Sequence, residues 1–152
     1  AEVATVRTLP QPLGLACAAD HLLTRRDREG APLNPDELAG ERFAVMLPGF
    51  GLRALHDEFT RVHGVAGDIV LETDSQAVLI GTVAQGQAVS LLPPVFLTPA
   101  PPGSEVVLLD VADEHVQAVR AELMVRRGRR LPPAARALLD TCADWMDSRA
   151  VR

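Results

Sequence analysis

Three short loops hold the residues whose types and spacing suit the binding of a small anion. Glycines, hydroxyl side chains and prolines make up these loops, which contain Gly49, Phe50 and Gly51, then Thr73, Asp74 and Ser75, and finally Pro93, Pro94 and Val95. The first two loops precede segments with helical patterns, so unpaired N–H groups and the positive end of a helix dipole should lie there. Such helix starts favour an anion such as a carboxylate. A structural role fits the same residues: Ser75 would only cap its own helix, and the glycines would only make a turn.

The elements that must position these loops are alternating strands and helices. Short apolar runs bounded by Gly, Pro or Asp predict buried parallel strands at 43–47, 68–72 and 88–92. An apolar stripe with a period of 3.6 residues predicts a helix at 52–63. A second helix should begin at Asp74 or Ser75 and end at Gly86, and it is apolar nearly all round, so it should be deeply buried. Right-handed crossovers would place both helix starts at the carboxyl edge of the strands, where open α/β sheets bind ligands.

The rest of the chain has weaker patterns. They predict strands at 3–9, 13–17, 105–109 and 117–126, a helical turn and loop within 24–30, a helix of one or two turns at 34–40, and a rigid loop at 98–103. The strand at 3–9 has no hairpin partner nearby, which suggests a fragment of something longer. The last helix should start at Pro132 or Pro133 and needs a partner surface for one apolar face, made of Ala135, Leu138, Leu139, Cys142, Trp145 and Met146.

Other polar residues favour structural roles over chemistry. His56 and His63 lie seven residues apart on the predicted helix, but no acid or Cys has metal-ligand spacing beside them, so surface roles are favoured. Asp57 and Arg61 have the spacing of a solvated helix pair. The arginine cluster at 126–130 could contact phosphate or an acidic partner, although a solvated turn is the simpler interpretation.

Catalytic motifs are missing from the sequence. It contains no Gly-x-Ser-x-Gly elbow, no phosphate-binding loop and no full dinucleotide fingerprint. His21 follows Asp20, but no nucleophile accompanies them. We therefore expect no enzyme activity, no catalytic residue, no metal and no cofactor.

Composition predicts a soluble, cytoplasmic domain. A chain of 152 residues with 47% hydrophobic and 23% charged residues is long enough for a real core. The net charge of −5 argues against nucleic-acid binding by this chain itself. Cys17 and Cys142 fit no disulfide or metal spacing and are expected to be buried thiols. No apolar run is long enough for a membrane span, and no export leader is present, so no membrane partner is expected.

Several motifs, in order along nearly the whole chain, resemble the effector-binding domain of LysR-type transcriptional regulators. They are Ala19–Leu22, with Leu22 in place of a proline, Leu33–Gly40, the helix with Gly49 and Arg53, Ile69–Ser75, Val83–Gly86 leading to Val89–Pro93, and Arg126–Ala135. The resemblance implies an α/β fold: a Rossmann-like lobe of a periplasmic-binding-protein-like (type 2) domain, with a mostly parallel sheet and helices on both faces. Residues 1–12 would end the first lobe, 13–113 would form the second, effector-binding lobe, and 114–152 would return to the first lobe as a crossover strand and a helix.

The resemblance also implies a function and partners. A small organic anion would bind between two lobes, with the nine loop residues named above as the contacts of the second lobe. DNA would be bound by an N-terminal winged helix-turn-helix domain that is absent from this chain. The protein would be a homodimer or homotetramer, with polar residues of the helix at 52–63 at the contact: Arg53, His56, Asp57, Thr60 and Arg61. The alternative is a solute-binding protein of a transport system, which shares the two-lobe architecture.

Overall fold

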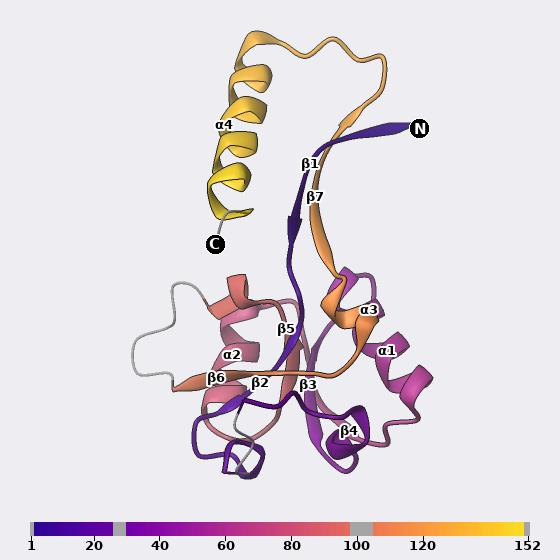
Figure 1. The fold of residues 1–152 in the computed structure, drawn as a ribbon, viewed down its shortest axis with the longest axis vertical. Coiled ribbons are helices and arrows are strands. Elements are labelled where there is room, and N and C mark those ends of the chain that lie inside the picture. The colour runs from indigo at the N-terminus through magenta and orange to yellow at the C-terminus, as the bar shows by residue number, and fades with distance from the viewer. Residues whose placement is uncertain (1, 26–29, 98–104, 151–152) are drawn as a thin grey trace. The chain divides into compact units, whose positions relative to one another are not determined.

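The computed structural model describes residues 2–25, 30–97 and 105–150, and the chain divides into two compact units (Figure 1). Unit 1 comprises residues 1–11 and 118–152, and unit 2 comprises residues 12–117. The loop predicted at 98–103 lies outside the described residues, as does most of the predicted turn at 24–30. No helix within the described ranges is long and apolar enough to cross a bilayer.

Strand pairing in unit 2 is mixed. Strand β2 (Gly14–Ala18) lies between β5 (Ser90–Leu92) and β6 (Val106–Asp110) and runs antiparallel to both. Strand β3 (Arg42–Met46) pairs in parallel with β4 (Asp68–Thr73). A single parallel bridge between Phe43 and Val89 links β3 to the segment that enters β5. The expectation of a mostly parallel sheet is therefore not confirmed, because the fully buried strand β2 opposes both of its neighbours.

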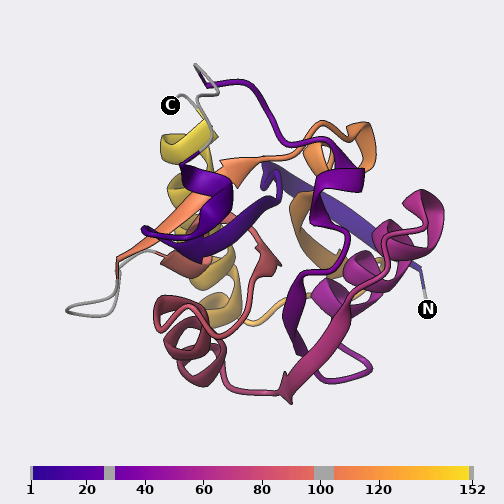
Figure 2. The ribbon, with the colours of Figure 1, turned by 90° about the horizontal axis from the view of Figure 1, so that it is seen from below.

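The two long helices of unit 2 lie on opposite sides of β3 (Figures 1 and 2). Helix α1 (Gly51–His63) ends at Gly64, which adopts the left-handed conformation with φ of 63° that favours glycine. Helix α2 (Gln76–Ala84) begins after Ser75, whose side chain accepts a hydrogen bond from the first turn. Helix α1 was predicted from its periodicity and end signals and α2 from its end signals, and the structure confirms both helices.

Short helical turns connect the remaining elements of unit 2. They are η1 (Leu22–Thr24), η2 (Pro35–Leu38), η3 (Pro94–Leu97) and α3 (Glu114–Gln117). In η2, the Asn34 backbone N–H donates to the Glu37 carboxylate at 2.8 Å, which is half of a capping box. The turn at η2 was expected. Helix α3 was not expected; it lies just before the segment predicted as a strand at 117–126 and overlaps it at Gln117.

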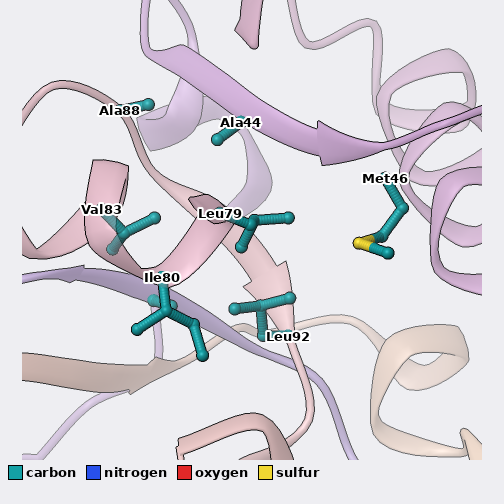
Figure 3. Close-up of a cluster of buried hydrophobic side chains, with 8 residues drawn as sticks. Ala44, Met46, Leu79, Ile80, Val83, Ala88 and Leu92 are labelled. Atoms are coloured by element: carbon teal, nitrogen blue, oxygen red, sulfur yellow. The ribbon is translucent and has the colours of Figure 1, made fainter. Parts of the chain in front are cut away.

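A cluster of buried side chains from β2, β3, α2, β5 and the segment before β5 forms the core of unit 2 (Figure 3). Its members are Ala16, Ala44, Met46, Leu79, Ile80, Val83, Ala88 and Leu92. Only the inner face of α2 contributes, because Val78 on the same helix is 51% exposed. The prediction that α2 is buried nearly all round is therefore wrong. The sequence of α2 has a second apolar face, but no described element covers it.

Strand β4 is also more exposed than its apolar sequence predicts. Ile69 is 42% exposed and Val70 is 47% exposed. This exposure follows from the position of β4 at an edge, because β3 is the only described strand with which β4 pairs. An apolar strand with one open edge is typical of a surface that another chain or segment covers.

Unit 1 is built from the two ends of the chain. Strand β1 (Val3–Pro10) pairs antiparallel with β7 (Arg120–Arg126), so the partner that β1 lacks nearby in sequence comes from more than a hundred residues later. Helix α4 (Pro133–Ala150) packs against β1, and the Arg7 guanidinium donates to the Asp147 carboxylate at 2.9 Å. The predicted apolar face of α4 is only partly covered. Met146 is buried, whereas Leu138 is 65% exposed and Trp145 is 46% exposed.

Candidate functional site

The three predicted loops follow β3, β4 and β5 and are joined by hydrogen bonds. The Leu47 N–H donates to the Thr73 carbonyl at 3.0 Å, which connects the first loop to the second. The Gln76 side-chain amide donates to the Phe96 carbonyl at 2.9 Å, which connects the start of α2 to the third loop. The structure therefore brings the predicted residues to one edge of the unit. We call residues 47–51, 73–76 and 93–96 the loop edge.

The first loop leaves the start of α1 without a side-chain cap. Gly49 has φ of 100°, a conformation that side chains rarely adopt, and it allows the tight turn out of β3. Phe50 occupies the N-cap position, 43% exposed, and its side chain offers no acceptor to the first turn. The Arg53 N–H already donates to the Phe50 carbonyl at 3.1 Å, so the amide donors before it, at Gly51 and Leu52, are the ones suited to an anionic ligand.

The second loop is ordered by its own hydroxyl groups. Thr73 Oγ1 accepts from the Ser75 N–H at 3.0 Å, and Ser75 Oγ accepts from the Val78 N–H at 3.4 Å. Ser75 is thus a helix cap, as the structural interpretation requires. Its hydroxyl hydrogen can still donate to a ligand, because a hydroxyl is one donor and two acceptors. Asp74 is exposed beside it.

The third loop combines a buried and an exposed proline. Pro93 is buried, whereas Pro94 and Val95 are exposed in η3. Gln76 fixes this loop through the bond to Phe96 described above. Sequence reasoning missed Gln76, and only its position directly after the predicted cap could have drawn attention to it.

Arg53 connects the loop edge to the body of α1. Its guanidinium donates to the Asp57 carboxylate at 2.8 Å and to the Met46 carbonyl at 3.4 Å, and it forms an ion pair with Glu72. The side chain is only 15% exposed, and the hydrogen bonds that it donates to Asp57 and then to Glu72 raise its pKa. Met46 and Glu72 lie at the ends of β3 and β4, so Arg53 holds both strand ends.

These contacts correct two predictions about the surface of α1. Arg53, which was expected on the polar surface of the helix at the subunit contact, folds onto β4 and pairs with Glu72. Asp57 pairs with Arg53 rather than with Arg61, whose partner is Glu58 at 2.7 Å. Sequence spacing cannot separate i,i+3 from i,i+4 partners when several acids lie within one turn.

The two histidines of α1 have different environments. His56 is only 5% exposed and packs edge-on against Phe43, with ring centroids 4.9 Å apart, so the prediction of a surface role is wrong for it. His63 Nε2 lies 2.6 Å from Asp113 Oδ2, which connects the end of α1 to the start of α3. Within residues 2–25, 30–97 and 105–150, no group of three His, Cys, Asp or Glu side chains could hold a metal.

Cys17 should resist alkylation in the folded protein. It is fully buried in β2, and burial, with a smaller contribution from Glu41, raises the pKa of its thiol to about 11. At pH 8 only roughly one thiol in a thousand would be thiolate, the reactive form. We expect iodoacetamide at pH 8 to modify the half-buried Cys142 but not Cys17, as read by mass spectrometry of peptides. Urea-unfolded protein is the control, in which both should react, and rapid native labelling of Cys17 would contradict the prediction.

Comparisons with known proteins agree with this architecture. The family described as "LysR substrate binding domain" matches residues 1–147. The HTH-type transcriptional regulator CbbR of Rhodospirillum rubrum is 29% identical over 130 residues, which cover 86% of this chain and 41% of that protein. The chain thus spans less than half the length of this curated relative.

Two solved structures share the fold. The CcmR regulatory domain of Synechocystis PCC6803, in complex with 2-PG, aligns with a TM-score of 0.75 and 19% identity, covering 95% of this chain and 72% of that one. The effector binding domain of QuiR, in complex with shikimate, aligns with a TM-score of 0.71 and 16% identity, covering 96% of this chain and 66% of that one. With a family match over residues 1–147, this chain belongs to the LysR substrate binding domain family.

Proposed function

We propose that this chain is the effector-sensing part of a LysR-type transcriptional regulator. It binds a small organic anion between two lobes and thereby controls transcription, without a catalytic step. The observation that carries the proposal is the loop edge, where hydrogen bonds join three loops around the uncapped start of α1 and the start of α2. Family membership supports the regulator over a transport protein.

The proposed lobes follow the chain in three segments. Residues 13–113 form the second lobe, which carries the loop edge, and residues 1–12 and 114–152 belong to the first lobe. The remainder of the first lobe and a winged helix-turn-helix domain that binds DNA belong to the longer, cytoplasmic protein. The chain's coverage of 41% of its relative CbbR leaves room for both.

Backbone amides and hydroxyls are the proposed contacts for the effector's negative charge. Arg53 is committed to Asp57, Glu72 and the Met46 carbonyl, so its guanidinium is not the anion receptor. The remaining donors are the first N–H groups of α1 and α2, before Arg53 and Val78, and the Ser75 hydroxyl. The exposed side chains of Phe50 and Val95 would contact the effector's apolar part. The ligands of the solved relatives, 2-PG and shikimate, support a small molecule of this kind.

The mechanism is a population shift. An effector that contacts both lobes favours one relative orientation of them, by as much as its affinity differs between the two states. That orientation changes how the subunits of an oligomer present their DNA-binding domains. The upstream coding sequence tests this assignment. A winged helix-turn-helix before the first lobe supports the regulator, whereas an export leader would identify a solute-binding protein.

The proposed homodimer or homotetramer uses α1 and β4. Exposed apolar residues on these elements include Val62, at 49%, and Ile69, at 42%. Replacing both with aspartate in the full-length protein should raise the dissociation constant of the dimer at least about tenfold, because charges would enter an apolar contact. Analytical ultracentrifugation gives the measurement. Leu22→Asp is the matched control, since Leu22 is 75% exposed elsewhere in unit 2, and an unchanged dimer in the double variant would exclude this surface.

A further inference from the structure

A small cavity lies between α1 and the strands of unit 2, behind the loop edge. Its volume is about 10 Å³, which is close to the lower limit of about 10–15 Å³ for holding one water molecule. The wall is formed mainly by apolar side chains of α1, β3, α2 and β5. Two polar residues interrupt it: His56 from α1 and Ser90 from β5.

Both polar residues are removed from bulk solvent. His56 is 5% exposed and Ser90 is 3% exposed. Among the described residues, His56 Nδ1 is buried without a hydrogen-bond partner. A buried nitrogen of this kind is costly unless something bonds to it, and buried polar groups in folded proteins nearly always have partners.

The imidazole is suited to a neutral partner. Burial lowers the pKa of His56, so the ring is uncharged at neutral pH, and one nitrogen accepts while the other donates. Phe43 packs edge-on against the ring at a centroid distance of 4.9 Å, which restricts how far the ring can move. The cavity is too small for an ion with its hydration shell or for an organic ligand.

We propose that this cavity is a structural water site, in which one water molecule bonds to His56 Nδ1 and to the Ser90 hydroxyl. The water would connect α1 to β5 from within the core. These elements adjoin two of the three loops, because α1 begins at the first loop and β5 ends at the third. The water is therefore part of the packing that fixes the spacing of these loops, and its existence does not depend on which effector binds.

The test counts long-lived internal waters by oxygen-17 magnetic relaxation dispersion on the intact chain. His56→Phe should remove one such water relative to the unmodified protein, and Ser90→Ala should remove the same one. The double variant should therefore also lack only one internal water molecule. If the two residues held separate water molecules, the double variant would lack two. Circular dichroism establishes that each variant is folded, and His115→Phe, at an exposed histidine, is the matched control that should change nothing.

Two outcomes would overturn the site. One is an unchanged water count in folded His56→Phe, and the other is the loss of two waters in the double variant. If His56→Phe fails to fold, cross-relaxation between water and the His56 ring protons in the unmodified protein decides the matter. A cross-peak whose sign is that of a water molecule bound for longer than nanoseconds supports the site, and the absence of a cross-peak excludes the site.

Discussion

Replacing Gly14 with alanine should lower the free energy of unfolding by about 1–3 kcal/mol, the usual cost of overpacking a core. A Cβ at this position would lie 2.6 Å from Leu108 Cγ and 2.9 Å from the Leu109 carbonyl oxygen. Neither atom can move freely, because one is the branch point of a side chain and the other belongs to the backbone of β6. Gly14 opens β2, the fully buried strand between two partners, so the clash would strain the whole sheet. Urea unfolding followed by circular dichroism gives the measurement.

Gly81→Ala is the matched control because it makes the same chemical change in an open place. A Cβ at Gly81 would meet nothing within 4 Å, and the residue lies inside α2. Alanine there should raise the free energy of unfolding by about 0.5–1 kcal/mol through the better helix propensity of alanine. Equal effects in both variants would contradict the steric argument.

Replacing Ser75 with aspartate should weaken effector binding at least about tenfold, or ~1.4 kcal/mol. The new carboxylate would face the anion proposed to bind at the starts of α1 and α2, and like charges a few ångströms apart repel. Aspartate is also a good N-cap, so α2 should still begin at the same place. Titration calorimetry of the full-length protein measures the change, using the tightest acid from a screen of small carboxylates that starts with shikimate and 2-PG.

Ser75→Asn separates charge from shape. Asparagine has nearly the size of aspartate and caps helices equally well, but it is neutral, so its affinity should stay close to that of the unmodified protein. If aspartate leaves the affinity unchanged, Ser75 is a structural cap only and the effector does not bind beside it. If both substitutions weaken binding equally, size rather than charge is responsible.

Local signals were sufficient to predict the β3–α1–β4–α2–β5 order. The strands are short apolar runs, α1 has a regular stripe and ends at Gly64, and α2 starts after a capping serine. These signals act within a few residues, so they can be recognised without knowledge of the fold. The same pattern predicted that the three loops meet at one edge, because parallel strands place their carboxyl ends together.

Features that depend on distant partners could not be predicted. Periodicity located α1 but not the direction of Arg53, which is set by Glu72 on another strand. His56 is buried because Phe43 packs against it, and β4 is exposed because, among the described strands, only β3 pairs with it. The antiparallel direction of β2 likewise depends on where the chain enters and leaves the unit.

The pairing of β1 with β7 has a consequence for the order in which the chain folds. Joining two strands more than a hundred residues apart in an unfolded chain carries a large loop-closure entropy. Once unit 2 has formed, the Leu13 N–H donates to the Val116 carbonyl at 2.9 Å, so the segments leading to β1 and β7 emerge side by side. The two strands can then pair residue by residue, as the strands of a short hairpin do. We therefore expect unit 2 to fold first and unit 1 to form after it.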